Sequence, residues 1–241
     1  RCSAAFPLDV WGKSGLPRFF ATPMKAHLLF PLLALTAASA DVTLPPLFSD
    51  NLLLQQPQSA VWGKADPGEE VTVTLGKTSA KAAAGADGKW RVELAGLKPG
   101  LAGDLTVAGK NTLTVRNVAV GDVWVGSGQS NMEMTVVSGT WCKYGGAVDA
   151  AREVAEANYP ALRMFITVKK GEPQPMENVE GRWEVCTPEN LPHWSAAGYF
   201  FARQLHRDLG GLPIGLIQSS VGGSSCQSWT PDAAVKADLE L

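Results

Sequence analysis

The hydrophobic and polar positions follow two different patterns, which change near Val118. Between residues 41 and 117, short β-type runs are separated by turn residues, and in residues 70–75 every second position is apolar. A period of two is typical of antiparallel strands with one buried face. The pattern predicts a small antiparallel β-sandwich over residues 41–117, whose other strands lie at 60–62, 90–94, 104–107 and 112–116.

From Val118 to Leu241, apolar runs and amphipathic segments alternate, which is typical of a parallel sheet with crossover helices. We predict strands at 120–125, 162–168 and 214–217, and helices at 146–158 and from Ser195, its N-cap, to about Leu209. A polar loop is predicted at 169–193, and a loop of that length is usually functional or flexible. The predicted fold class is therefore α/β, with a β-sandwich at 41–117 and a parallel-sheet domain at 118–241.

A short apolar segment precedes these domains. Residues 24–27 (MKAH) carry positive charge, residues 28–37 are apolar, and Ala38-Ser-Ala40 fits a signal-peptidase site. We interpret residues 24–40 as a secretory signal peptide, which predicts a secreted or periplasmic protein. The apolar run is too short for a membrane span, which needs roughly 20 residues. Residues 1–23 show no sustained period and are interpreted as non-native or upstream sequence.

The composition is that of a soluble globular protein, with 45% hydrophobic residues and a formal net charge of -2. The segment after residue 40 has no basic run, which argues against a nucleic-acid partner, and we predict no membrane partner. The composition makes no prediction of oligomeric state.

Three cysteines follow the signal segment: Cys142, Cys186 and Cys226. They favour either one disulfide with one thiol or three buried thiols. His193 and His206 have no partners at metal-ligand spacing, so no metal site is predicted.

The chemistry of the chain is concentrated at residues 121–133. An apolar run, Val123-Trp-Val125, stops at the Gly126-Ser-Gly128 turn, and Ser130 follows on the next segment. Such a strand-to-helix turn exposes a hydroxyl beside the unpaired N–H groups of a new helix, where an oxyanion could be held. Ser130 is therefore the candidate nucleophile.

Other interpretations of this turn differ in how well the residues fit them. A dinucleotide fingerprint lacks its third glycine, and a phosphate loop lacks its Gly-Lys-Ser/Thr end. A hydrolase elbow needs glycine where Met132 lies. An ordinary strand-to-helix turn without chemistry remains open on the local sequence alone.

The residues around Ser130 resemble the first block of the SGNH hydrolases, in the branch of sialate O-acetylesterases and related carbohydrate acetylesterases. The resemblance runs from Pro45 to the C-terminus, and its motifs are at 121–132, 183–190, 197–203, 213–224 and 228–231. It implies a flavodoxin-like parallel sheet, a serine hydrolase acting on an acetylated carbohydrate, and no cofactor.

The same resemblance implies roles for individual residues. The backbone N–H groups of Ser130 and Gly223 would hold the oxyanion, with Gly222 as the next candidate, and residues 129, 131 and 132 (Gln129, Asn131 and Met132) would bind substrate. Val221 and Gln227 replace the Trp and the acidic residue that the family often has. These differences change the pocket wall but leave the backbone donors in place.

The general base is the missing part. In the SGNH family it comes from a late Asp-x-x-His, and no Asp in this chain is followed three residues later by His. We therefore expect the chain to hold the first half of the catalytic domain and to be inactive alone. His193 lies in a predicted loop and His206 late on a helix, where a cation is common. Neither is predicted to be catalytic.

The β-sandwich raises a second possibility, a non-catalytic carbohydrate-binding protein. Trp62 and Trp90 could stack on a sugar ring, although a tryptophan in an alternating strand more often belongs to the core. A downstream Asp-x-x-His would favour the enzyme over the binding protein.

Overall fold

The computed structural model describes residues 41–139, 146–172 and 174–237. The predicted upstream segment (1–23), the signal peptide (24–40) and Cys142 lie outside the described residues, so export stays a prediction. The described residues belong to one compact unit. Within them, no helix is long and apolar enough to cross a membrane.

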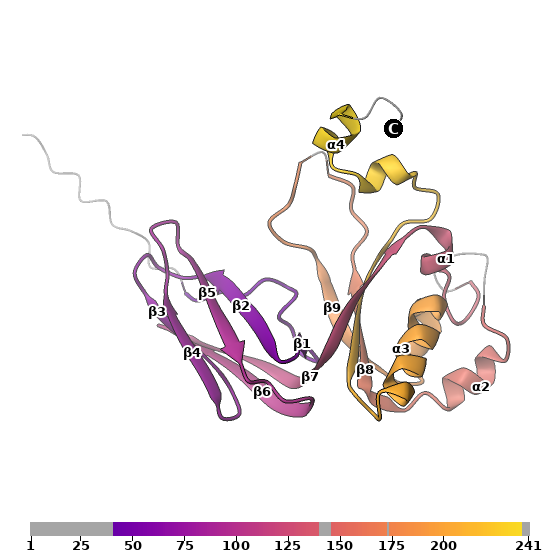
Figure 1. Ribbon diagram of the computed structural model, residues 1–241, viewed down its shortest axis with the longest axis horizontal. Helices are drawn as coiled ribbons and strands as arrows, with labels where there is room; N and C mark the ends of the chain where they lie inside the picture. Colours follow the sequence, from indigo (N-terminus) through magenta and orange to yellow (C-terminus); the bar gives the residue numbers. More distant parts are fainter. Residues whose placement is uncertain (1–40, 140–145, 173, 238–241) are drawn as a thin grey trace, which may run out of the picture. The chain divides into compact units, whose positions relative to one another are not determined.

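The strands dominate the architecture (Figure 1). They are β1 (Leu53–Gln55), β2 (Gln58–Lys64), β3 (Glu70–Leu75), β4 (Thr78–Ala83), β5 (Lys89–Ala95), β6 (Gly100–Ala108), β7 (Thr112–Gly128), β8 (Tyr159–Thr167), β9 (Gly181–Cys186) and β10 (Ile214–Ser220). The helices are α1 (Ser130–Glu133), α2 (Ala150–Ala155), α3 (Ala196–Asp208) and α4 (Asp232–Ala237), with 3-10 turns η1 (Leu191–His193) and η2 (Cys226–Trp229).

One large sheet runs through the chain in the order β4-β3-β6-β7-β10-β8-β9, with β1 also pairing with β7. Strand β7 pairs antiparallel with β6 in its first part and parallel with β10 in its second. Strand β10 also pairs parallel with β8, so the three predicted parallel strands do share one sheet. The fold is therefore mixed α/β. Because β7 crosses residues 117 and 118 without a break, a division into domains there stays a prediction.

Two hydrophobic cores flank this sheet. In the first, Val61 and Val92 from the separate β2-β5 pair lie in the same core as Val73 and Val107 from the large sheet. The apolar positions of β3 are buried, as their alternation predicted. In the second core, α3 packs on β8 and β10 through Tyr199 and other buried side chains.

Several predicted elements differ from those observed. The predicted flavodoxin-like order is wrong for the described strands, because it places the first of three parallel strands in the middle, whereas here the third, β10, lies between β7 and β8. The predicted 169–193 loop contains β9, which pairs antiparallel with β8 at the edge of the sheet. The predicted 146–158 helix is confined to α2, because Gly146 and Asp149 both have positive φ angles just before it.

Helix α3 agrees closely with its prediction. The Ser195 hydroxyl accepts a hydrogen bond from the Gly198 N–H at 3.0 Å, which is the expected N-cap contact. Gly210 and Gly211 follow with positive φ, and the Gly211 N–H donates to the carbonyl of His206 at 2.8 Å. Leu209, the C-cap residue of the helix, is 47% exposed.

The two cysteines among the described residues are both free, and only one of them is buried. Cys186 is buried and free, and burial raises the pKa of its thiol to about 12. Cys226 is also free but exposed, so the prediction of three buried thiols is wrong for this residue.

A buried arginine joins β8 to the bulged part of β7. Arg163 is 1% exposed and donates to the Leu52 carbonyl at 3.0 Å and to the Asn117 side-chain oxygen at 3.2 Å. It also donates to the carbonyl of Asn117, which has a φ of 56°. Burial lowers the pKa of Arg163 to about 10, so the side chain stays charged at neutral pH.

We expect Arg163→Ala to lower the free energy of unfolding by about 2 kcal/mol, because it removes the hydrogen bonds that the buried guanidinium donates to Leu52 and Asn117. Urea denaturation followed by circular dichroism measures the change. Arg116→Ala is the matched control, because the Arg116 side chain is 70% exposed and should change stability by less than about 0.5 kcal/mol. Equal denaturation midpoints for the two variants would contradict the role assigned to Arg163.

Candidate active site

Ser130 lies on an exposed turn at the end of β7. Strand β7 ends at Gly128, whose φ of 131° suits glycine, and α1 begins two residues later at Ser130. The predicted strand and helix are confirmed, but the predicted turn at 126–128 is wrong, because these residues continue β7 and the bend lies at Gln129. Ser130 itself is exposed, as a nucleophile on a surface turn must be.

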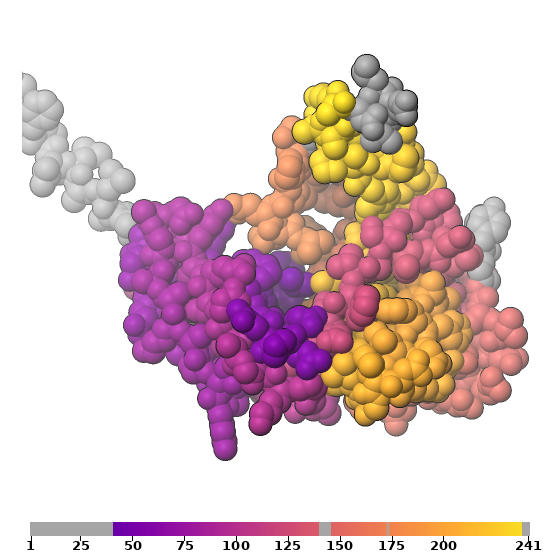
Figure 2. Space-filling view, in the orientation of Figure 1, coloured from indigo at the N-terminus to yellow at the C-terminus, as the bar shows by residue number. Residues whose placement is uncertain are grey.

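The second predicted block leaves the sheet beside the first. Strands β7 and β10 are parallel neighbours, and Ser220, the last residue of β10, pairs with Gly128. The Val221 N–H donates to the Gly128 carbonyl at 3.0 Å, which continues the pairing into the loop. Figure 2 shows the two segments adjacent at the surface, with the α1 segment in rose and the segment after β10 in yellow. Both loops thus lie at the carboxyl ends of parallel strands, where ligands gather in open α/β sheets.

One side-chain oxygen lies between Ser130 and Gly223. The amide oxygen of Gln129 accepts hydrogen bonds from the Ser130 hydroxyl at 3.1 Å and from the Gly223 N–H at 3.3 Å. Gly223 has a φ of 80°, which favours glycine. A hydroxyl and a backbone N–H that share one oxygen form the pair of groups that an acyl-transfer site requires.

Gly222 is packed closely against the same turn. A β-carbon at Gly222 would lie 2.6 Å from Glu133 Oε2 and 3.5 Å from Ser130 Oγ. The shorter distance is to the end of the Glu133 side chain, which would have to move away to admit a β-carbon at Gly222.

Glu133 binds the Gly222 loop, a contact that the sequence analysis missed. Its carboxylate accepts a hydrogen bond from the Gly222 N–H and forms an ion pair with Lys169, which follows β8. The Glu133 side chain is 13% exposed and that of Lys169 33%. Burial lowers the pKa of Lys169, while the adjacent carboxylate acts in the opposite direction. The only local signal was that Glu133 lies three residues after Ser130, on the same face of a helical turn.

Comparison with known proteins finds relatives of the chain. No family model matches the chain. Sialate O-acetylesterases of Pongo abelii and Homo sapiens are each 35% identical to it over 215 residues, which cover 78% of this chain and 38% of each relative. The crystal structure of a carbohydrate acetylesterase from Xanthomonas citri is similar at a TM-score of 0.75 and 36% identity, covering 81% of this chain and 44% of that one.

The chain is a homologue of the curated sialate O-acetylesterases, at 35% identity over 78% of its length. It spans less than two fifths of the length of the curated relatives that it matches, with 38% of each covered.

The two histidines among the described residues have other partners. His193 Nε2 lies 2.7 Å from Oε2 of Glu184, which also accepts from the Trp194 indole at 3.0 Å and is 5% exposed. His206 Nδ1 lies 2.6 Å from the Leu212 carbonyl. Among the described residues, no histidine hydrogen-bonds to Ser130.

A small cavity of about 20 Å³ lies beside the turn and includes His193 in its lining. Glu133, Lys169, Gln218 and Ser220 line the same cavity. His193 is therefore closer to the candidate site than its position in a predicted loop suggested, although its imidazole is bound to Glu184.

The three predicted substrate-binding residues differ in exposure. Gln129 and Asn131 are exposed beside Ser130, and substrate binding stays a prediction for both. Met132 is partly buried and its sulfur accepts from the Ser195 hydroxyl at 3.5 Å. These contacts favour a role for Met132 in anchoring the turn to α3.

Proposed function

We propose that the protein is a carbohydrate O-acetylesterase with Ser130 as its nucleophile. The observation that carries this proposal is the shared oxygen of Gln129, which the Ser130 hydroxyl and the Gly223 N–H both contact. In this interpretation the Gln129 oxygen occupies the position of a substrate carbonyl oxygen. The names of the relatives, sialate O-acetylesterase and carbohydrate acetylesterase, support the same reaction.

The reaction would proceed by acyl transfer. Ser130 Oγ attacks the acetyl carbonyl as its proton passes to a base, and the N–H groups of Ser130 and Gly223 hold the negative oxygen. The sugar oxygen leaves with a proton, and water then hydrolyses the acetyl-serine to acetate. Gly223 is preferred over Gly222 as the donor, because Glu133 already accepts from the Gly222 N–H.

The base and its orienting carboxylate would come from an Asp-x-x-His segment, as the resemblance to SGNH hydrolases implies. The chain itself contains no such segment. We therefore propose that activity requires a protein that carries these residues together with that segment, and that the 241-residue chain is inactive alone.

Release of acetate tests the proposal. A protein carrying these residues and an Asp-x-x-His segment should liberate acetate from O-acetylated sialic acid or from acetylated xylan, measured by an enzyme-coupled acetate assay. The methyl ester of sialic acid is the matched control and should release no methanol. Binding of the acetylated sugars without acetate release would instead favour the non-catalytic carbohydrate-binding alternative.

A further inference from the structure

A pocket of about 520 Å³ lies on the β2-β5 pair and shares no lining residue with the small cavity beside Ser130. Its walls come from three parts of the chain: residues 43–45, the paired strands β2 and β5, and residues 177–178 of the segment between β8 and β9. Pockets of this volume are typical of small-molecule sites.

The aromatic wall of the pocket is Trp62. Its indole is only partly buried and is held edge-on by Phe48, at 4.7 Å between ring centroids and an interplanar angle of 82°. Trp90 also lines the pocket but is 3% exposed, so only Trp62 has ring surface for a ligand. A fixed, partly exposed indole can stack on the apolar face of a pyranose ring.

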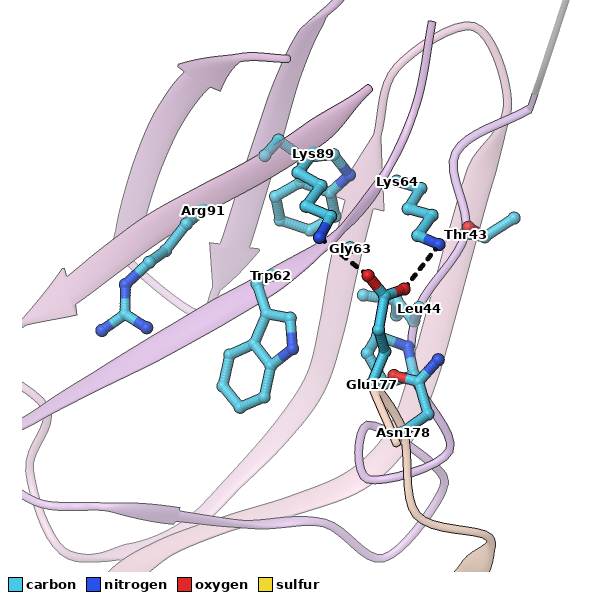
Figure 3. A pocket seen from close by; sticks show the side chains of 11 residues that line it. Thr43, Leu44, Trp62, Gly63, Lys64, Lys89, Arg91, Glu177 and Asn178 are labelled. Atoms are coloured by element: carbon cyan, nitrogen blue, oxygen red, sulfur yellow. Dashed lines mark hydrogen bonds and ion pairs between the residues drawn. The ribbon is translucent and has the colours of Figure 1, made fainter. Parts of the chain in front are cut away.

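The rim of the pocket carries excess positive charge. Lys64 and Lys89 both form ion pairs with Glu177, at 2.9 and 2.8 Å, and all three side chains are more than half exposed, at 55 to 57%. Each ammonium has three donors, so both lysines keep N–H groups for a second acceptor. Figure 3 shows the Trp62 indole between Arg91 on one side and Glu177 with its two lysines on the other.

Glu177 shows that this end of the pocket accepts a carboxylate. Its oxygens receive hydrogen bonds from both lysines, and these bonds lower its pKa to about 2. Two lysines share this one carboxylate, so a positive charge remains beside the indole for a ligand anion.

We propose that this pocket is a second carbohydrate site, separate from Ser130, for a pyranose residue that bears a carboxylate. The sugar ring stacks on Trp62, and its carboxylate binds Lys64 and Lys89. The proposal does not depend on ester hydrolysis, because none of its residues belongs to the candidate active site.

A titration of the full 241-residue chain carrying Ser130→Ala tests the site without turnover. Methyl β-D-glucuronide is added up to about 10 mM, a range suited to millimolar affinity, and binding is followed by saturation-transfer NMR. Trp62→Ala should weaken binding about tenfold by removing the stacking surface. The double variant Lys64→Ala/Lys89→Ala should weaken binding about tenfold as well, by removing charged donors.

Matched controls separate the pocket from general effects. Trp124→Ala removes a tryptophan that is 45% exposed elsewhere, and Lys81→Ala removes a lysine whose side chain is 59% exposed, so both should leave binding unchanged. Trp62→Phe keeps an aromatic face and should still bind the glucuronide, so it shows whether loss of binding by Trp62→Ala comes from misfolding.

Absence of binding by the parent chain, or binding that survives Trp62→Ala, would overturn the site. Equal binding of neutral methyl β-D-glucoside would overturn the role of the carboxylate.

Discussion

Ser130→Ala should lower ester turnover by a factor on the order of 10⁶ in a protein that carries the Asp-x-x-His segment. The reason is that the nucleophile, base and carboxylate of a triad act as one unit, so loss of the serine removes covalent catalysis completely. Steady-state hydrolysis of 4-nitrophenyl acetate measures the change. KM should change much less than kcat, because the pocket around the turn is left intact.

Ser127→Ala is the matched control for this substitution. Ser127 is an exposed serine on the same segment, in the last part of β7, and its loss should leave kcat within about twofold. The 241-residue chain alone should hydrolyse the ester no faster than its own Ser130→Ala variant. Ser130-dependent turnover by that chain would contradict the expectation and would make His193 the base to examine.

The features that could be predicted from the sequence are local ones. The alternation in β3, the Ser195 cap of α3 and the helix start at Ser130 depend on residues close together in the chain. The meeting of the Ser130 and Gly223 loops was also predictable, because both follow strands of one parallel sheet. Strand ends at one edge bring such loops together without any further signal.

The features that were missed depend on pairing between distant segments. Strand β9 is short and becomes a strand by pairing with the edge of β8, while β4 is rich in alanine, which has low strand propensity. The position of β10 between β7 and β8 is likewise a property of the sheet, not of any one segment. The Glu133–Lys169 pair joins residues from α1 and the end of β8, and no local pattern links them.

The second large effect is expected from Glu133, because the Glu133–Lys169 pair holds the loop that carries the proposed oxyanion donor, Gly223. Glu133 accepts from the Gly222 N–H while Lys169 holds the carboxylate, so Gly223 is positioned by a chain of two contacts. Glu133→Ala removes both contacts, and we expect kcat to fall by about 10², as for the loss of one oxyanion donor. KM for 4-nitrophenyl acetate should change little, since Glu133 acts through Gly222 and not on the ester.

Glu133→Gln separates positioning from charge. The amide oxygen can still accept from the Gly222 N–H, so this variant should recover most of the activity, to within about tenfold of the parent. Lys169→Met keeps the Glu133 carboxylate and removes its ion-pair partner, so its kcat should lie between those of Glu133→Ala and Glu133→Gln.

A merely structural role would lower the melting temperature of Glu133→Ala without a specific loss of kcat in the folded protein. Unchanged kcat in Glu133→Ala would exclude Glu133 as a positioning residue, and equal losses in the Ala and Gln variants would assign the effect to its charge.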